Sequence, residues 1–224
     1  MKKLFTKLLI SVSLILIDIS LIAAQAENDN SPETPRQSTS IMQALMSLFR
    51  SSENRFISRG ESVCLISPGN SGEQLVWSDR PLFIWRGEMM TPTEINLYTA
   101  DSDLNEQPVW TETILPNTNT ITYTGQLQPG STYDWELVSD DNTYRKTMQL
   151  MEQPQREAIA AELTSITNNL QDSNATAEDI AIAKADYFIS QKLGSDALQE
   201  LYSVENPSAD LAEQISNIEQ QLCE

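Results

Sequence analysis

The fold is indicated most clearly by one stretch, Leu127-Gln128-Pro129-Gly130-Ser131-Thr132-Tyr133-Asp134-Trp135-Glu136-Leu137. Within it, Pro129-Gly130 is a turn signal. From Tyr133 to Leu137, large apolar residues alternate with acidic ones, so that one face of a strand is apolar and the other is polar. The stretch therefore predicts a tight turn that leads into a half-buried β-strand.

This pattern of L-x-P-G followed by Y-x-W-x-L resembles the corner between strands E and F in fibronectin type III and immunoglobulin-like sandwiches. In those domains a tyrosine near the start of strand F bonds through its hydroxyl to the backbone a few residues upstream. The resemblance implies this role for Tyr133. It concerns how the fold is built and implies no reaction.

Residues 62–152 consist of short strand-like runs separated by turn signals. The runs are Val63–Ile66, Gln74–Trp77, Leu82–Trp85, Glu94–Thr99, Val109–Ile114, Thr120–Thr124, Thr132–Val138 and Tyr144–Leu150. Many short strands at regular spacing predict a sandwich or barrel, and we expect an antiparallel β-sandwich. Trp85, Tyr133 and Trp135 are its expected core residues, because large aromatic side chains contribute the most buried area.

Outward-facing aromatic residues of this sandwich would suit a carbohydrate-binding domain. Asn96 and Tyr98 are expected to face solvent, because they alternate with apolar residues. Tyr98, Trp110 and Tyr144 are the candidates for a platform that stacks on sugar rings. The alternative is that these aromatic residues pack in the core or pair across strands.

The first 26 residues have the pattern of a secretory signal peptide. Three lysines precede an almost wholly apolar run from Leu8 to Ile22, and Ala24-Gln25-Ala26 is a cleavage site. An uncleaved anchor is the alternative, although the carboxylate of Asp18 within the run disfavours a stable span. We therefore expect export to the periplasm or cell surface, with no stable membrane anchor after cleavage.

Charge and composition exclude several classes of function. The chain has a net charge of −18, and removal of residues 1–26, with three lysines and one aspartate, would make it −20. Such a protein repels nucleic acid at long range. The chain also has no histidine, which excludes histidine-based triads and most zinc sites.

The only two cysteines are Cys64 and Cys223. In an oxidising compartment an even pair favours a disulfide, which would attach the C-terminus to the first strand of the sandwich. Two separate buried thiols are the alternative, because sequence alone does not fix connectivity.

Helical patterns lie on both sides of the sandwich. Residues 27–61 are predicted to be a disordered linker that contains a short amphipathic helix at 41–50. After Pro154 the apolar period changes from 2 to 3.6 residues, so residues 153–224 are predicted to form an α-helical tail of short antiparallel helices. Thr176 to Asp179 approximates a capping box within this tail.

Part of the tail, residues 175–208, resembles the second half of a tetratricopeptide repeat. The resemblance rests on Ala185-x-Tyr187, Leu193-Gly194, Asp196-Ala197-Leu198 and Pro207. It implies a repeat-like helical hairpin, not an array, because stable stacks need three or more units. A partner-binding groove is predicted around four residues of this hairpin: Tyr187, Phe188, Leu198 and Tyr202. The alternative is that most of these side chains belong to the core.

Most of the chain after residue 26 resembles a family of exported, chiefly cyanobacterial proteins of unknown function. The motifs are C-L-I-x-P, W-x-x-x-P-L-F-x-W, L-x-P-G-x-x-Y-x-W and, in the tail, A-L-x-x-L-Y. They stand here at Cys64–Pro68, Trp77–Trp85, Leu127–Trp135 and Ala197–Tyr202. The resemblance implies localisation in the cell envelope and adds no catalytic residues.

Metal binding has one candidate segment. Asp101, Asp103, Asn105 and Glu112 have the ligand spacing of an EF-hand calcium loop. Glu106 stands where that loop needs glycine, so a hairpin loop without calcium is the preferred interpretation. No cofactor is implied by any motif.

We therefore expect a non-enzymatic exported module that binds another protein. No nucleophile motif or phosphate-binding loop stands in the sequence. A carbohydrate-binding sandwich is one alternative. A hydrolase that uses a pair of carboxylates is the other, because such an enzyme needs no histidine.

Overall fold

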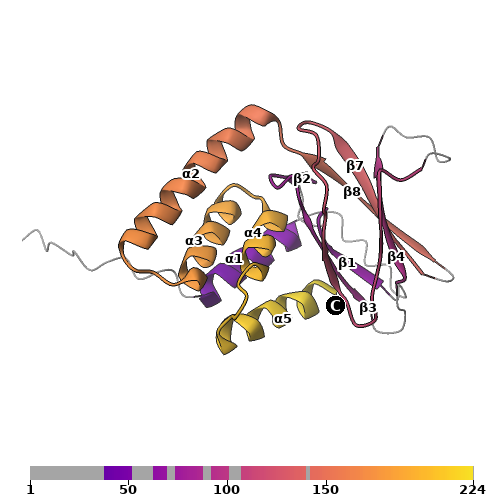
Figure 1. The fold of residues 1–224 in the computed structure, drawn as a ribbon. Coiled ribbons are helices and arrows are strands. Elements are labelled where there is room, and N and C mark those ends of the chain that lie inside the picture. The colour runs from indigo at the N-terminus through magenta and orange to yellow at the C-terminus, as the bar shows by residue number, and fades with distance from the viewer. Residues whose placement is uncertain are drawn as a thin grey trace, which may run out of the picture. The chain divides into compact units, whose positions relative to one another are not determined.

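The computed structural model describes residues 38–51, 63–69, 74–87, 92–100, 107–139 and 142–223. They belong to one compact unit that extends from Thr34 to Glu224. One helix precedes the strands and four helices follow them (Figure 1). The described part of the chain is thus a mixed β and α fold with two sheets and five helices, as predicted at this level.

Eight strands form the two sheets. They are β1 (Val63–Ser67), β2 (Leu75–Val76), β3 (Leu82–Gly87), β4 (Glu94–Thr99), β5 (Trp110–Thr113), β6 (Thr120–Thr122), β7 (Thr132–Val138) and β8 (Thr143–Leu150). The small sheet has the order β1-β3-β6, and the large sheet has the order β2-β8-β7-β4-β5. All pairs are antiparallel except β2 with β8.

The two sheets enclose an apolar core formed by alternate residues of their strands. Trp135 is fully buried, and Trp85 and Tyr133 lie beside it in the same buried cluster. The rings of Phe83 and Trp135 lie 5.0 Å apart between centroids. The indole N–H of Trp135 donates to the carbonyl oxygen of Pro68 at 3.1 Å, so burial leaves this donor paired.

The turn that precedes β7 is fixed by the hydroxyl of Tyr133. That oxygen accepts a hydrogen bond from the backbone N–H of Gln128 at 2.9 Å. Gly130 has a φ of 77°, which glycine adopts without steric cost. The N–H of Gly130 donates to the carbonyl of Leu150 at 2.9 Å, so the turn is bonded to both β7 and β8.

Removal of this hydroxyl gives a first prediction. We expect Tyr133→Phe to lower the free energy of unfolding by about 1–2 kcal/mol, because the N–H of Gln128 loses its acceptor while the ring stays packed. Urea denaturation followed by tryptophan fluorescence measures the change. An unchanged denaturation midpoint would show that the hydroxyl does not hold the turn.

The five helices are α1 (Ser38–Ser51), α2 (Gln153–Asp172), α3 (Ala177–Ser190), α4 (Gly194–Tyr202) and α5 (Ala209–Cys223). At the start of α3, the backbone N–H of Asp179 donates to the hydroxyl of Thr176 at 3.1 Å, and the N–H of Thr176 donates to the carboxylate of Asp179 at 2.9 Å. This is the predicted capping box. The Asp side chain thus takes the place of the usual Glu or Gln.

Helix α1 belongs to the helical layer. Ile41, Leu45 and Phe49 share one buried cluster with side chains of α3, α4 and α5. Their spacing gives the predicted apolar stripe. The helix is longer than expected at both ends, and residues 52–62 lie outside the described part of the chain.

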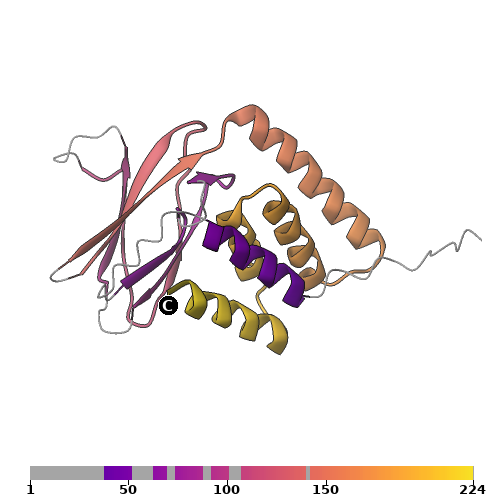
Figure 2. The ribbon, with the colours of Figure 1, turned by 180° about the vertical axis from the view of Figure 1, so that it is seen from behind.

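The helices cover the outer face of the small sheet (Figures 1 and 2). Leu65 and Phe83 point to the core between the sheets. Their neighbours Ile66 and Ile84 are buried among helical side chains instead. The order of layers is therefore helices, small sheet and large sheet.

The predicted signal peptide, residues 1–26, lies outside the described part of the chain. Among the helices that are described, none is both long enough and apolar enough to cross a membrane. Export to the periplasm or cell surface stays a prediction.

Candidate functional site

The outer face of the large sheet is the candidate functional surface. The described helices all lie on the other side of the small sheet, as both ribbon views show (Figures 1 and 2). Residues of β4, β7 and β8 that point away from the core therefore form a face that the described helices do not cover. We call it the outer sheet face and define it by six residues: Glu94, Asn96, Tyr98, Asp134, Glu136 and Arg145.

Strand alternation and register bring these side chains together. In β4, Ile95 and Leu97 are fully buried in the core, so the residues between and beside them face outward. Asn96 lies opposite Glu136 in the neighbouring strand β7. Glu136 in turn lies opposite Arg145 in β8. One row of polar residues thus crosses three strands.

Arg145 links the two carboxylates of β7. Its guanidinium forms an ion pair with Glu136 and lies 3.8 Å from the carboxylate of Asp134. The hydroxyl of Thr147 donates to Asp134 at 2.5 Å. The Glu136 side chain is only 8% exposed, whereas that of Arg145 is 44% exposed. Arg145 therefore holds the buried carboxylate of Glu136 in place, while the guanidinium itself stays open to solvent.

Asn96 faces outward, as alternation predicts, but its side chain is nearly buried. It is only 5% exposed. Its amide donates to Glu94 at 2.8 Å, and its carbonyl accepts from the hydroxyl of Thr111 at 2.6 Å. Cross-strand neighbours thus bury it, which alternation within one strand does not predict.

Tyr98 completes the outer sheet face. The guanidinium carbon of Arg145 lies 5.7 Å from the centre of the Tyr98 ring. Desolvation raises the pKa of Tyr98, and the negative charge of Glu136 raises it further, so the phenol stays protonated at neutral pH. The six residues carry three carboxylates and one guanidinium, and the face is suited to hydrogen bonding and ionic recognition.

The three aromatic residues predicted for a sugar platform do not share one surface. Tyr98 points outward, whereas Trp110 stacks on the core residue Phe83 with 5.9 Å between ring centroids. Tyr144 lies opposite the buried Leu137 and packs against the core. The packing alternative thus describes Trp110 and Tyr144.

The predicted calcium loop is only partly described. Asp101, Asp103 and Asn105 lie outside the described residues. Glu112 is exposed in β5, opposite Ile95 of β4. In the part of the chain that the structure describes, no three acidic, cysteine or histidine side chains are grouped as a metal site requires.

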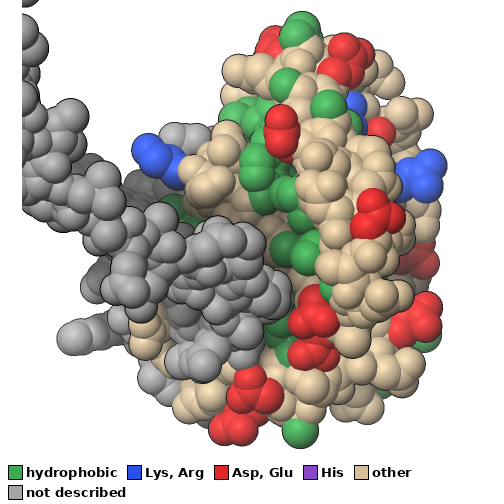
Figure 3. All heavy atoms as spheres, turned by 90° about the vertical axis from the view of Figure 1, so that its left-hand side faces the viewer, with side chains coloured by type: hydrophobic (Ala, Val, Ile, Leu, Met, Phe, Trp, Pro, Cys, Tyr) green, Lys and Arg blue, Asp and Glu red, His purple; other side chains and the backbone are tan. Residues whose placement is uncertain are grey.

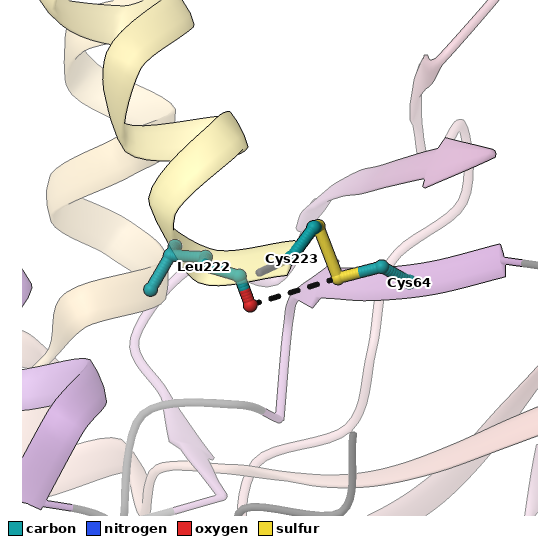
Figure 4. Close-up of a disulfide and its surroundings, with 3 residues drawn as sticks. All are labelled: Cys64, Leu222 and Cys223. Atoms are coloured by element: carbon teal, nitrogen blue, oxygen red, sulfur yellow. Dashed lines mark hydrogen bonds between the residues drawn. A yellow bond between two sulfur atoms is a disulfide. The ribbon is translucent and has the colours of Figure 1, made fainter. Parts of the chain in front are cut away.

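Cys64 of β1 and Cys223 of α5 form a disulfide (Figure 4). Their Cα atoms lie 5.7 Å apart, across a sequence separation of 159 residues. The carbonyl oxygen of Leu222 lies 3.8 Å from the sulfur of Cys64, and this contact becomes a hydrogen bond only in the reduced thiol, because a disulfide sulfur carries no proton. The bond attaches the last turn of the helical layer to the edge of the small sheet.

The predicted groove is not an open surface. Phe188 and Leu198 are 1% exposed, because α1 packs against both helices of the hairpin that carries them, and the ring of Trp77 lies 5.5 Å from that of Phe188 between centroids. Tyr202 is partly buried and its hydroxyl donates to Glu219. Tyr187 is half-buried, and its pKa is raised by desolvation and by Glu162 of α2. These residues are therefore mainly structural.

Figure 3 shows the side of the molecule on which α2 lies. Hydrophobic side chains form a broken stripe down this face, and acidic side chains outnumber basic ones around it. Helix α2 itself buries only Ile159 and Leu163.

A buried carboxylate that sequence reasoning missed joins the two parts of the fold. Asp196 of α4 accepts hydrogen bonds from the backbone N–H groups of Trp77 and Ser78, at 2.9 and 2.8 Å. It is only 3% exposed, and desolvation raises its pKa to about 6, although the two N–H groups act in the opposite direction. These partners stand about 120 residues away in the chain, so no local pattern indicates them.

Helix α2 holds the same loop from its other side. Arg156 donates to the carbonyl of Trp77 at 2.9 Å and forms an ion pair with Asp79 at 3.3 Å. The indole N–H of Trp77 donates to the carbonyl of Arg156 at 3.0 Å. We call this set of contacts, together with those of Asp196, the loop clasp. It fixes the helical layer on the sheets.

Comparison of the chain with protein families, curated proteins and solved structures found no match.

Proposed function

We propose that this protein is a non-enzymatic exported module, of the periplasm or the cell surface, that binds another protein through the outer sheet face. The observation that carries the proposal is the one-sided cover of the sandwich. The helices cover the small sheet, and the large sheet presents charged and amide groups that their neighbours hold in place. Groups held in place by their neighbours lose little conformational entropy when a partner binds.

We further propose that the two sheets form a sandwich of the immunoglobulin and fibronectin type III kind. The order β1-β3-β6 opposite β4-β7-β8 corresponds to strands A-B-E opposite C-F-G of those domains. The hydrogen bond to the Tyr133 hydroxyl supports the same assignment. For the tail, the short turn between α3 and α4 supports a hairpin like that of a tetratricopeptide repeat.

Site-specific cross-linking tests the proposed function. A photoreactive amino acid would replace Thr113, which is exposed on β5 beside the outer sheet face, in the full chain expressed in its own envelope. The matched position is Ala161, exposed on α2 in the helical layer. We expect a reproducible protein adduct from position 113 and none from position 161.

Two outcomes would contradict the proposal. Adducts from position 161 alone would move the binding surface to the helices. The absence of protein adducts from both positions, with the cross-linker shown to be active, would argue against a protein partner.

A further inference from the structure

Strand β5 is the edge of the large sheet, and its exposure distinguishes it from the other strands. It pairs with β4 on one side, and the sheet order gives it no second neighbour among the described strands. Thr111, Glu112 and Thr113 are all exposed. In an antiparallel pair, alternate residues direct their N–H and C=O groups away from the neighbour. The outer side of β5 therefore offers backbone groups to an added strand.

Two large hydrophobic side chains mark the ends of this edge. Val109 is 53% exposed and Leu115 is 69% exposed, and no other large hydrophobic residue of the described chain is so open. Pairing with β4 continues for one residue beyond each end of β5. The N–H of Val109 donates to the carbonyl of Leu97, and the N–H of Ile114 donates to the carbonyl of Thr93. The open stretch 109–115 spans about 20 Å at the usual rise of a strand.

The flanking prolines limit what this edge can accept. Pro108 and Pro116 stand directly outside the stretch, and proline has no N–H to give to a ladder. They prevent extension of a paired strand in either direction, which is a common protection against aggregation at sheet edges. The edge is thus suited to one short segment of about seven residues.

Charge decides which segment fits. Strands β4 and β5 together carry two glutamates, Glu94 and Glu112, and no lysine or arginine. Strand β7, on the far side of β4, adds Asp134 and Glu136, whose negative charge is partly offset by Arg145 of β8. A second copy of the chain would place acidic edge against acidic edge, in a protein with a net charge of −18. A basic segment is attracted to this edge instead.

We propose that the open edge of β5 receives a short extended segment of a partner protein, with alternating lysine or arginine side chains, as an added antiparallel strand. This inference rests on the proposed function and specifies the chemistry of the partner. Backbone hydrogen bonds supply the affinity in strand addition, and alternate side chains supply the specificity. Here the basic side chains would lie on the face of β5 that carries Glu112, and the apolar side chains would lie on the opposite face, beside Val109 and Leu115.

The test uses two capped heptapeptides as probes, one of alternating Lys and Val and one of alternating Glu and Val. Each is titrated into the full protein without its first 26 residues, at low ionic strength, and backbone amide shifts are followed by NMR. We expect saturable shifts at residues 109–115 with the Lys-Val peptide and none with the Glu-Val peptide. Raising the salt concentration should weaken the binding.

A charge-matched pair of variants makes the test specific. Glu112→Lys should weaken Lys-Val binding about fivefold, because it reverses an exposed charge at the edge. Glu205→Lys makes the same change in net charge in the exposed loop after α4, and we expect its affinity to stay within about twofold of the original. Equal affinity of the two variants would overturn the inference, since binding would then reflect net charge alone.

Other outcomes also separate the inference from the proposed function. Shifts that map to the helices, or self-association through β5 in sedimentation experiments, would overturn the basic-strand inference. If position 113 forms a protein adduct in the envelope but the Lys-Val peptide does not bind at β5, the proposed function is supported and the inference of strand addition is overturned.

Discussion

Replacement of Cys64 and Cys223 by alanine is expected to lower the free energy of unfolding by about 3–5 kcal/mol. The disulfide closes a loop with a sequence separation of 159 residues, and loop closure restricts the unfolded chain more as the loop lengthens. The chain-entropy model gives about 5 kcal/mol for a loop of this size, and measured losses are commonly smaller. Urea denaturation of the oxidised protein and of the variant gives the difference.

The design of this experiment distinguishes the bond from the packing of its two residues. Cys64→Ala, Cys223→Ala and the double variant should be destabilised nearly equally, because each removes the same bond. A reducing agent should lower the stability of the original protein toward that of the variants. Additive losses in the double variant, or a reducing agent without effect, would show that the two sulfurs act separately.

The structural consequence should be local as well as global. Cys223 ends α5, whose buried residues Leu211 and Ile218 lie toward the middle and start of the helix. Without the bond, the last turn loses its covalent attachment to β1. We therefore expect faster hydrogen exchange near residue 223 and smaller changes near Leu211.

The strands could be predicted because their signals are local. Period-two alternation and turn residues stand within each run, and the predicted runs end within two residues of the observed strands. The turn at Pro129-Gly130 likewise carries its own signal. Helix boundaries have weaker local signals: glycine commonly ends a helix, yet Gly194 begins α4, because the chain already turns at Lys192 with a φ of 62°.

The candidate site could be predicted only in part, because its features depend on contacts between distant segments. Alternation places Asn96 on the outer face, but its burial depends on the register of β5 against β4. The sequence pattern around Phe188 and Leu198 predicts a groove, but α1, which precedes the strands in the chain, shares one buried cluster with these residues. Local periodicity does not show which segments pair, so it cannot predict how deeply these residues are buried.

Asp196 gives the second large effect, and its size should depend on pH. We expect Asp196→Ala to lower the free energy of unfolding by about 4 kcal/mol at pH 4, because two backbone N–H groups of the loop clasp lose their acceptor and a buried gap is left. The loss should shrink to about 1.5 kcal/mol at pH 8. Urea denaturation at several pH values between 4 and 8 measures both limits.

The direction follows from the raised pKa of Asp196, which is about 6 in the folded protein against 3.8 ordinarily. Between these two values the folded state binds the proton more tightly than the unfolded state, so the contribution of this group to stability decreases as the pH rises. The decrease is complete above pH 6 and amounts to about 3 kcal/mol, at 1.36 kcal/mol for each pKa unit. The alanine variant lacks the titrating group and therefore lacks this slope.

Two comparisons make the pH dependence specific to Asp196. Asp172→Ala, at the exposed end of α2, should change stability by less than about 0.5 kcal/mol at every pH. Asp196→Asn keeps one acceptor and cannot ionise, so it should also lose the slope while it stays more stable than the alanine variant at pH 4. A difference between the original protein and Asp196→Ala that is constant from pH 4 to 8 would contradict a raised pKa at this buried carboxylate. In that case the carboxylate would hold the loop in its ionised form across the whole range, and the two N–H groups would outweigh its desolvation.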